Sequence, residues 1–183
     1  MRHETCIESR EVFNGRVLHL TVDRVRLPNG RESELEVIEH PGASAVVAID
    51  DDVHVLLVNQ YRYATGGWVV EIPAGKLDPG EAPETCAHRE LEEEVGCRAG
   101  SLISLGWIWT TPGFTDEKIW LYLATDLETT QQNLCEHEVL SVERHPFDEA
   151  CAAAESGEMT DGKTVCALLR ARHHLSRGTK MIR

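Results

Sequence analysis

The sequence has little that would mark a secreted or membrane-spanning protein. None of its apolar runs approaches the roughly 20 residues of a membrane span, and the first residues lack the apolar core of a signal peptide, about 7 to 15 residues long. The six cysteines are widely separated and form no C-x-x-C pair, a pattern typical of reduced thiols rather than of a disulfide scaffold. We therefore expect a soluble cytoplasmic protein.

Basic residues are also scarce. The 183-residue chain carries 18 Lys and Arg against 31 Asp and Glu, a formal net charge of -13. This balance argues against sequence-independent binding to nucleic acid or to an anionic membrane. An anionic small-molecule substrate would need locally placed cations or a metal ion.

The first part of the chain reads as a small antiparallel sheet. Residues 12–39 largely alternate apolar and polar side chains, and Pro28-Asn29-Gly30 divides the two runs as a hairpin turn would. His40-Pro41-Gly42 ends the pattern. We predict an N-terminal β-sheet segment at residues 1–43 and a main domain at residues 44–183.

The main domain alternates predicted strands with predicted helices. Strands are expected at 45–49, 53–58, 68–73, 102–109, 119–125 and 139–143. Helices are expected at 82–95, 147–156 and 162–176. The pattern predicts an α/β fold with a mixed sheet flanked by helices.

The helix at 82–95 concentrates acidic residues. Its segment Arg89-Glu90-Leu91-Glu92-Glu93-Glu94 holds four carboxylates in five positions. Glu90 and Glu94 are four residues apart and share one helical face, with Glu93 at its margin. A solvated acidic surface is the alternative for so simple a pattern, but converging oxygen ligands are also what Mg2+ prefers.

Residues 75–97 resemble the Nudix box, G-x5-E-x7-R-E-U-x-E-E-x-G-U. Every fixed position is present, and only the last aliphatic position differs, where Cys97 can serve as a small hydrophobe. The resemblance implies an α/β/α sandwich and hydrolysis of a nucleoside diphosphate linked to another group. It also implies Mg2+, with Mn2+ as a possible substitute. The metal ligands would be Ala74 (through its carbonyl oxygen), Glu90, Glu93 and Glu94, and Glu81 and Arg89 would orient them.

Two segments outside the box resemble ADP-ribose pyrophosphatases of this family. One is the entry to the box at residues 68–78, together with a proline fifteen residues beyond it, Pro112. The other is Gln60-Tyr61-Arg62, which is similar to a Q-x-R segment. By this resemblance Arg62, Pro112 and Glu117 bind substrate, although Pro112 could be an ordinary turn residue and Arg62 could simply pair with a carboxylate.

The resemblance also places the general base in the acidic loop Cys135-Glu136-His137-Glu138. Glu136 is the first choice and Glu138 the second, with Glu93 shared between metal binding and catalysis. His137 is the expected solvated neighbour, since a lone loop histidine beside two acids is usually exposed. A loop of this kind can close over bound substrate only.

The preferred reaction is hydrolysis of ADP-ribose to AMP and ribose 5-phosphate. The alternatives are hydrolysis of a nucleoside diphosphate hexose, such as ADP-glucose or GDP-mannose, and a non-catalytic nucleotide-sugar sensor on the same fold. Cleavage of RNA ends is disfavoured because no basic stripe is present. The N-terminal sheet resembles the one through which this subgroup dimerises, which implies a homodimer.

Overall fold

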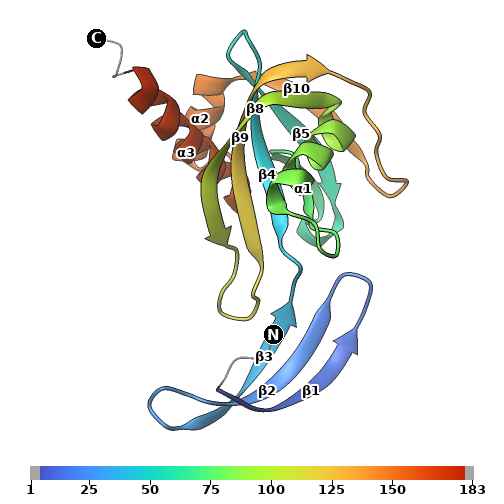
Figure 1. Ribbon diagram of the computed structural model, residues 1–183, viewed down its shortest axis with the longest axis vertical. Helices are drawn as coiled ribbons and strands as arrows, with labels where there is room; N and C mark the ends of the chain where they lie inside the picture. Colours follow the sequence, from blue (N-terminus) through green and yellow to red (C-terminus); the bar gives the residue numbers. More distant parts are fainter. Residues whose placement is uncertain (1–4, 180–183) are drawn as a thin grey trace. The chain divides into compact units, whose positions relative to one another are not determined.

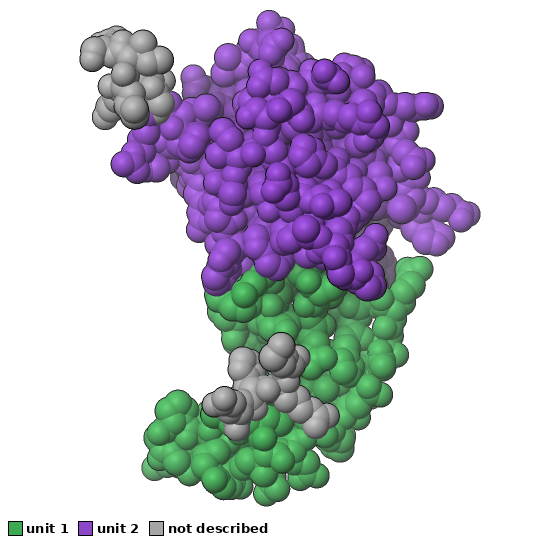
Figure 2. Space-filling model, in the orientation of Figure 1, with its two compact units in different colours: residues 1–42, 109–118 green, residues 43–108, 119–183 purple. Residues whose placement is uncertain are grey.

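The computed structural model describes residues 5–179, and they form two compact units (Figure 2). The first unit comprises the described residues up to Gly42 together with residues 109–118, and the second comprises 43–108 and the residues from 119 onward. Residues 109–118 contact the end of β3 and the residue after it: Ile38 bridges to Thr115, and the backbone N–H of His40 donates a 2.8 Å hydrogen bond to Asp116.

The first unit is built on an antiparallel sheet in the order β1-β2-β3. Its strands are β1 (Cys6–Asn14), β2 (His19–Arg26) and β3 (Glu32–Glu39). The predicted hairpin turn lies between β2 and β3, where Gly30 adopts φ 81°. That value belongs to the left-handed region that glycine enters without strain, so the local sequence fixes this turn.

The second unit contains a mixed sheet in the order β10-β5-β4-β9-β8, with β6 paired to β5 and β7 paired to β4. Its strands are β4 (Ala43–Ile49), β5 (His54–Arg62), β6 (Gly67–Glu71), β7 (Ala74–Lys76), β8 (Cys97–Trp109), β9 (Lys118–Thr129) and β10 (Leu140–Pro146). A short 3-10 turn, η1 (Tyr63–Thr65), joins β5 to β6. β4 runs parallel to β9 and antiparallel to β5, which confirms the predicted mixed sheet.

Helices cover both faces of this sheet (Figure 1). One face packs against α1 (Pro83–Glu90), and the other against α2 (Phe147–Ser156) and α3 (Gly162–Thr179). Because side chains alternate along a strand, β4 supplies both cores: Val46 faces α1 and Val47 faces α2 and α3. The predicted α/β/α sandwich is therefore confirmed. Among residues 5–179, no helix is long and apolar enough to cross a membrane.

The acidic helix differs from the prediction in its last turn. It begins at Pro83, and from Leu91 to Val95 it widens into a π-helical turn, η2. Gly96 then ends it with a left-handed φ of 71°. Sequence periodicity alone cannot distinguish a π turn from an α turn, yet such turns are frequent at functional sites. This one contains Glu93 and Glu94.

Candidate metal and diphosphate site

Arg89 organises the carboxylates of the acidic helix. Its Nε and Nη2 atoms each donate a 2.9 Å hydrogen bond to one oxygen of Glu81. Its Nη1 atom donates to Glu90 Oε1 at 2.5 Å and to Glu93 Oε2 at 3.1 Å. The planar guanidinium thus fixes three acidic side chains at once, which a point-charge ammonium could not do.

Glu94 and Glu90 are buried although both are acidic. Glu94 is 2% exposed, and its Oε2 atom accepts a 2.9 Å hydrogen bond from the backbone N–H of Ala74. Glu90 is 6% exposed and lies directly against Gly75. β7 therefore contacts both carboxylates through its backbone.

Burial makes the charged form of these carboxylates costly. It raises the pKa of Glu94 to about 8, and the nearby charges of Glu90 and Glu138 add to the rise. Burial likewise raises the pKa of Glu90, although Arg89 opposes the rise. Glu81 behaves in the opposite way, since its hydrogen bonds from Arg89 lower its pKa to about 2. A cation placed among Glu90 and Glu94 would relieve an unfavourable concentration of negative charge.

The donor set fits a hard divalent cation. Glu90 and Glu94 each have one carboxylate oxygen that accepts no hydrogen bond from residues 5–179. In the arrangement observed, the described part of the chain holds no cluster of three His, Cys, Asp or Glu side chains converged tightly enough to bind a metal. Arg89 pairs with one oxygen each of Glu90 and Glu93. The Ala74 carbonyl stays a predicted ligand.

The acidic loop is attached to the end of the same helix. Gln132 donates a 2.6 Å hydrogen bond from Nε2 to the carbonyl oxygen of Glu94, and the backbone N–H of Asn133 donates to the carbonyl oxygen of Glu93 at 3.0 Å. These bonds use carbonyl groups that a helix end leaves without intrahelical partners. The loop therefore begins at the carboxylate cluster.

The two predicted bases of this loop differ in their surroundings. Glu138 is half-buried and accepts a 2.9 Å hydrogen bond from the backbone N–H of Cys135. Its negative charge contributes to the raised pKa of both Glu90 and Glu94. Glu136 and His137 are exposed. Of the two predicted bases, Glu138 is thus the less exposed and the one whose charge acts on the cluster.

Arg62 is the cation that the sequence predicts for an anionic substrate. Its charge acts on Glu94, and its Nε donates a 2.7 Å hydrogen bond to Glu71 Oε1. Sequence reasoning missed Glu71, which is 2% exposed and also contacts Lys163. A signal was present, since Glu71 is the one charged residue in the apolar strand run at 68–73, and buried carboxylates require partners.

Pro112 and Glu117 belong to the first unit. Pro112 is exposed, in the turn between β8 and β9. Glu117 accepts a 2.8 Å hydrogen bond from the hydroxyl of Thr110, and one of its oxygens lies 3.4 Å from His40 Nδ1. These contacts give Glu117 a role within its own unit. Its contact with substrate, and that of Pro112, stays a prediction.

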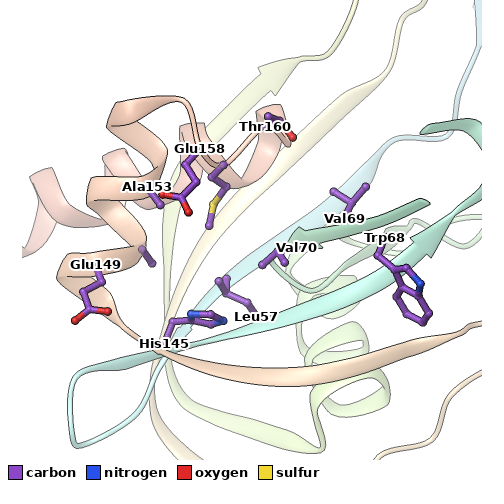
Figure 3. Close-up of a pocket in the computed structure, with 11 residues that line it drawn as sticks. Leu57, Trp68, Val69, Val70, His145, Glu149, Ala153, Glu158 and Thr160 are labelled. Carbon is purple, nitrogen blue, oxygen red and sulfur yellow. The ribbon is translucent and has the colours of Figure 1, made fainter. Parts of the chain in front are cut away.

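A cavity of about 490 Å3 lies on the α2 and α3 side of β5 and β6 (Figure 3). Leu57 and Val70 lie on its strand side, and Trp68 stands at its edge. None of the predicted site residues lines it. The described residues that line this cavity include neither Arg nor Lys, whereas the charge of Arg62 acts on Glu94, so the face that carries the box carboxylates is the better candidate for binding a diphosphate.

Comparisons with known proteins agree with this geometry. Residues 39–168 match the NUDIX domain model, and residues 4–38 match the nucleoside diphosphate sugar hydrolase N-terminal domain. An ADP-ribose pyrophosphatase of Bacillus subtilis is 41% identical, and a methanol dehydrogenase activator of Bacillus methanolicus is 42% identical, each over 90% of both chains. A crystal structure of an ADP compounds hydrolase superposes with a TM-score of 0.82 over 95% of both chains, at 26% identity.

Proposed function

Because this chain belongs to the Nudix hydrolase family, we propose that it hydrolyses the diphosphate bond of ADP-ribose with Mg2+, giving AMP and ribose 5-phosphate. One observation carries the proposal most. Glu90 and Glu94 are buried carboxylates, and the charge of Arg62, which Glu71 holds by a hydrogen bond, acts on Glu94. This arrangement suits a metal-bound diphosphate better than it suits a neutral ligand or a nucleic acid.

Glu90, Glu93 and Glu94 would hold the Mg2+, and Glu81 would act on them through Arg89. When bound, the metal neutralises diphosphate charge and lowers the pKa of a coordinated water. Arg62 binds the diphosphate through its two terminal nitrogens, which donate to no residue in the described range 5–179. The residues thus divide the work between holding the metal and holding the phosphates.

Glu138 is the general base that the geometry favours, ahead of Glu136. It would take a proton from the attacking water as the water oxygen bonds to phosphorus and the phosphorus–oxygen bond to the leaving phosphate breaks. The loop that carries it is attached to the helix end by Gln132 and Asn133, and the charge of Glu138 acts on Glu94. The exposed Glu136 would have to move inward with the loop to do the same.

The rival substrate class is a nucleoside diphosphate hexose. It is favoured by one observation, that Phe13 is the only aromatic residue among the first forty, so few rings are available there to stack on adenine. A hexose conjugate would use the same carboxylates and the same Arg62. The two readings differ only in the group beyond the diphosphate.

We also propose a homodimer formed through the first unit. Several large apolar side chains of its strands and of the connection between β1 and β2 are exposed: Ile7, Val12, Phe13, Val17, Leu18 and Leu35. Exposed apolar patches of this kind are typical of protein interfaces. Light scattering after size-exclusion chromatography should give twice the 20.4 kDa chain mass, and Phe13→Glu should shift it toward the monomer.

The substrate is tested by phosphate release, coupled to alkaline phosphatase, from ADP-ribose, ADP-glucose and GDP-mannose with Mg2+ or with EDTA. We expect kcat/KM for ADP-ribose to be about tenfold or more above either hexose conjugate, and no release in EDTA. A higher kcat/KM for a hexose conjugate than for ADP-ribose would show that the hexose conjugate is the substrate. No phosphate release from any of these compounds would favour a non-catalytic ligand sensor.

A further inference from the structure

Glu71 links two cations inside the second unit. It is the last residue of β6, and its side chain is 2% exposed. Oε1 accepts the 2.7 Å hydrogen bond from Arg62 Nε, while Oε2 pairs with Lys163 Nζ. Lys163 is 92 residues away in sequence, in the first turn of α3. One buried carboxylate therefore joins the substrate-facing arginine to a distant helix.

The start of α3 is fixed to the end of β6 by a second set of bonds. Lys163 Nζ lies 3.1 Å from Asp161 Oδ2, which also accepts hydrogen bonds from the N–H and the hydroxyl of Thr164. The Thr164 hydroxyl oxygen accepts a 2.9 Å hydrogen bond from the N–H of Ile72. Glu71, the last residue of β6, and Ile72, which follows it, thus contact the same helical turn, and this fixes the position of Lys163.

The pairing at Glu71 decides what Arg62 can offer to a ligand. Lys163 occupies Oε2, so Arg62 pairs with Oε1 alone, through Nε. The Arg62 side chain is 42% exposed, and no residue in the described part of the chain accepts from its terminal nitrogens. If Oε2 were open, the fork-shaped guanidinium could bond both carboxylate oxygens, the geometry that arginine prefers. A terminal nitrogen would then be lost to the diphosphate.

Stability alone is a weak reason to keep such a network. Lys163 is only 12% exposed, and removing charges from water costs free energy that their attraction often fails to recover. Apolar residues of similar size would frequently serve the fold as well. Orientation of Arg62, which Glu71 holds by a hydrogen bond, is the better reason for the network.

We propose that Lys163 is a positioning residue for substrate binding, which acts through Glu71 to keep the terminal nitrogens of Arg62 directed at the diphosphate. The proposal rests on the proposed function of Arg62 and extends the functional site to the first turn of α3. Lys163 itself need not touch the substrate. Its effect belongs mainly to the binding of the phosphates and less to the chemical step.

The first test is Lys163→Met, which keeps the length of the side chain and removes its charge. KM should rise about tenfold while kcat stays within about threefold, and Lys163→Arg should recover most of the loss. The matched control is Arg172→Met, which removes a cation of the same helix that pairs with Glu155 and has no link to Arg62. The control should leave KM unchanged.

A double-mutant cycle separates positioning from mere structural support. In an Arg62→Met background, Lys163→Met should raise KM no further, because the group through which it acts is gone. An equal rise in both backgrounds, or a fall in Tm with unchanged KM, would overturn the proposal. The proposed function has its own test, because it fails if the wild-type protein does not hydrolyse ADP-ribose. In that case the double-mutant cycle is measured as the affinity of each variant for α,β-methylene-ADP-ribose by calorimetry.

Discussion

Gly75 and the carboxylate of Glu90 occupy adjoining space: a Cβ atom on Gly75 would lie 1.9 Å from the Glu90 carboxyl carbon. No real contact is that short, so either the carboxylate or the strand would have to move. Close packing against Glu90, rather than backbone conformation, therefore requires a glycine at position 75, the first fixed position of the box.

Gly75→Ala should therefore displace Glu90 and weaken the proposed metal site. We expect the apparent Mg2+ affinity to fall about 10- to 100-fold, the range seen when a ligand loses its support, measured by titrating activity with Mg2+. Gly67→Ala is the matched control, because a Cβ on that glycine of β6 meets nothing within 4 Å. Equal behaviour of the two variants would contradict the role given to Gly75.

Arg89→Lys tests whether the forked guanidinium is needed. Lysine cannot bond both oxygens of Glu81 while also reaching Glu90 and Glu93, so kcat/KM should fall about 10- to 100-fold in a folded protein. Arg98→Lys is its control, because Arg98 makes a comparable two-bond pair with Glu92 at an exposed position. If both substitutions are harmless, Arg89 does not orient the cluster.

The raised pKa of Glu94 predicts how stability depends on pH in EDTA. Its ordinary pKa is 4.5, and in the folded protein it is about 8, so between these values the folded state holds a proton that the unfolded state has lost. The stabilising contribution present below pH 4.5 is thus progressively lost as pH rises to 8, by an amount on the order of several kcal/mol.

Glu94→Gln should remove this dependence, since glutamine does not titrate and its Oε1 can still accept from Ala74. We expect the Tm difference between Glu94→Gln and wild type, both in EDTA, to grow in favour of the variant from pH 5 to pH 8. Mg2+ should stabilise wild type and not the variant. Parallel pH profiles would show that Glu94 is not buried as a neutral acid.

The choice of general base is tested by comparing Glu138→Gln with Glu136→Gln. Loss of the base should lower kcat about 10^2- to 10^4-fold with little change in substrate binding. The geometry predicts this loss for Glu138→Gln and at most a small effect for Glu136→Gln. The reverse result would mean that the loop rearranges on binding substrate and brings Glu136 inward.

Much of the fold could be predicted because its elements carry local signals. The Pro28-Asn29-Gly30 turn, Pro83 in the first turn of α1 and Gly96 after its end each act within a few residues. The π turn at 91–95 could not be predicted, since it depends on how the helix end packs. The grouping of residues 109–118 with the first unit likewise depends on contacts distant in sequence.

The same division applies to the candidate site. The grouping of Glu90, Glu93 and Glu94 was predicted from their spacing on one helix, and the orienting role of Arg89 from the resemblance to the Nudix box. In the structure Arg89 donates to Glu81, Glu90 and Glu93. Glu71 and Lys163 were missed because their pairing joins positions 92 residues apart. A carboxylate in a buried strand indicates that it has a charged or hydrogen-bonding partner, but only the tertiary fold shows which residue that partner is.

The most direct test of the account is a crystal structure with Mn2+ and α,β-methylene-ADP-ribose, in which anomalous scattering locates the metal. We predict metal bound by carboxylate oxygens of Glu90 and Glu94 at about 2.0–2.2 Å, in contact with the diphosphate, and a terminal nitrogen of Arg62 on a phosphate oxygen. Metal bound elsewhere, or a diphosphate that does not meet these residues, would contradict the proposed site.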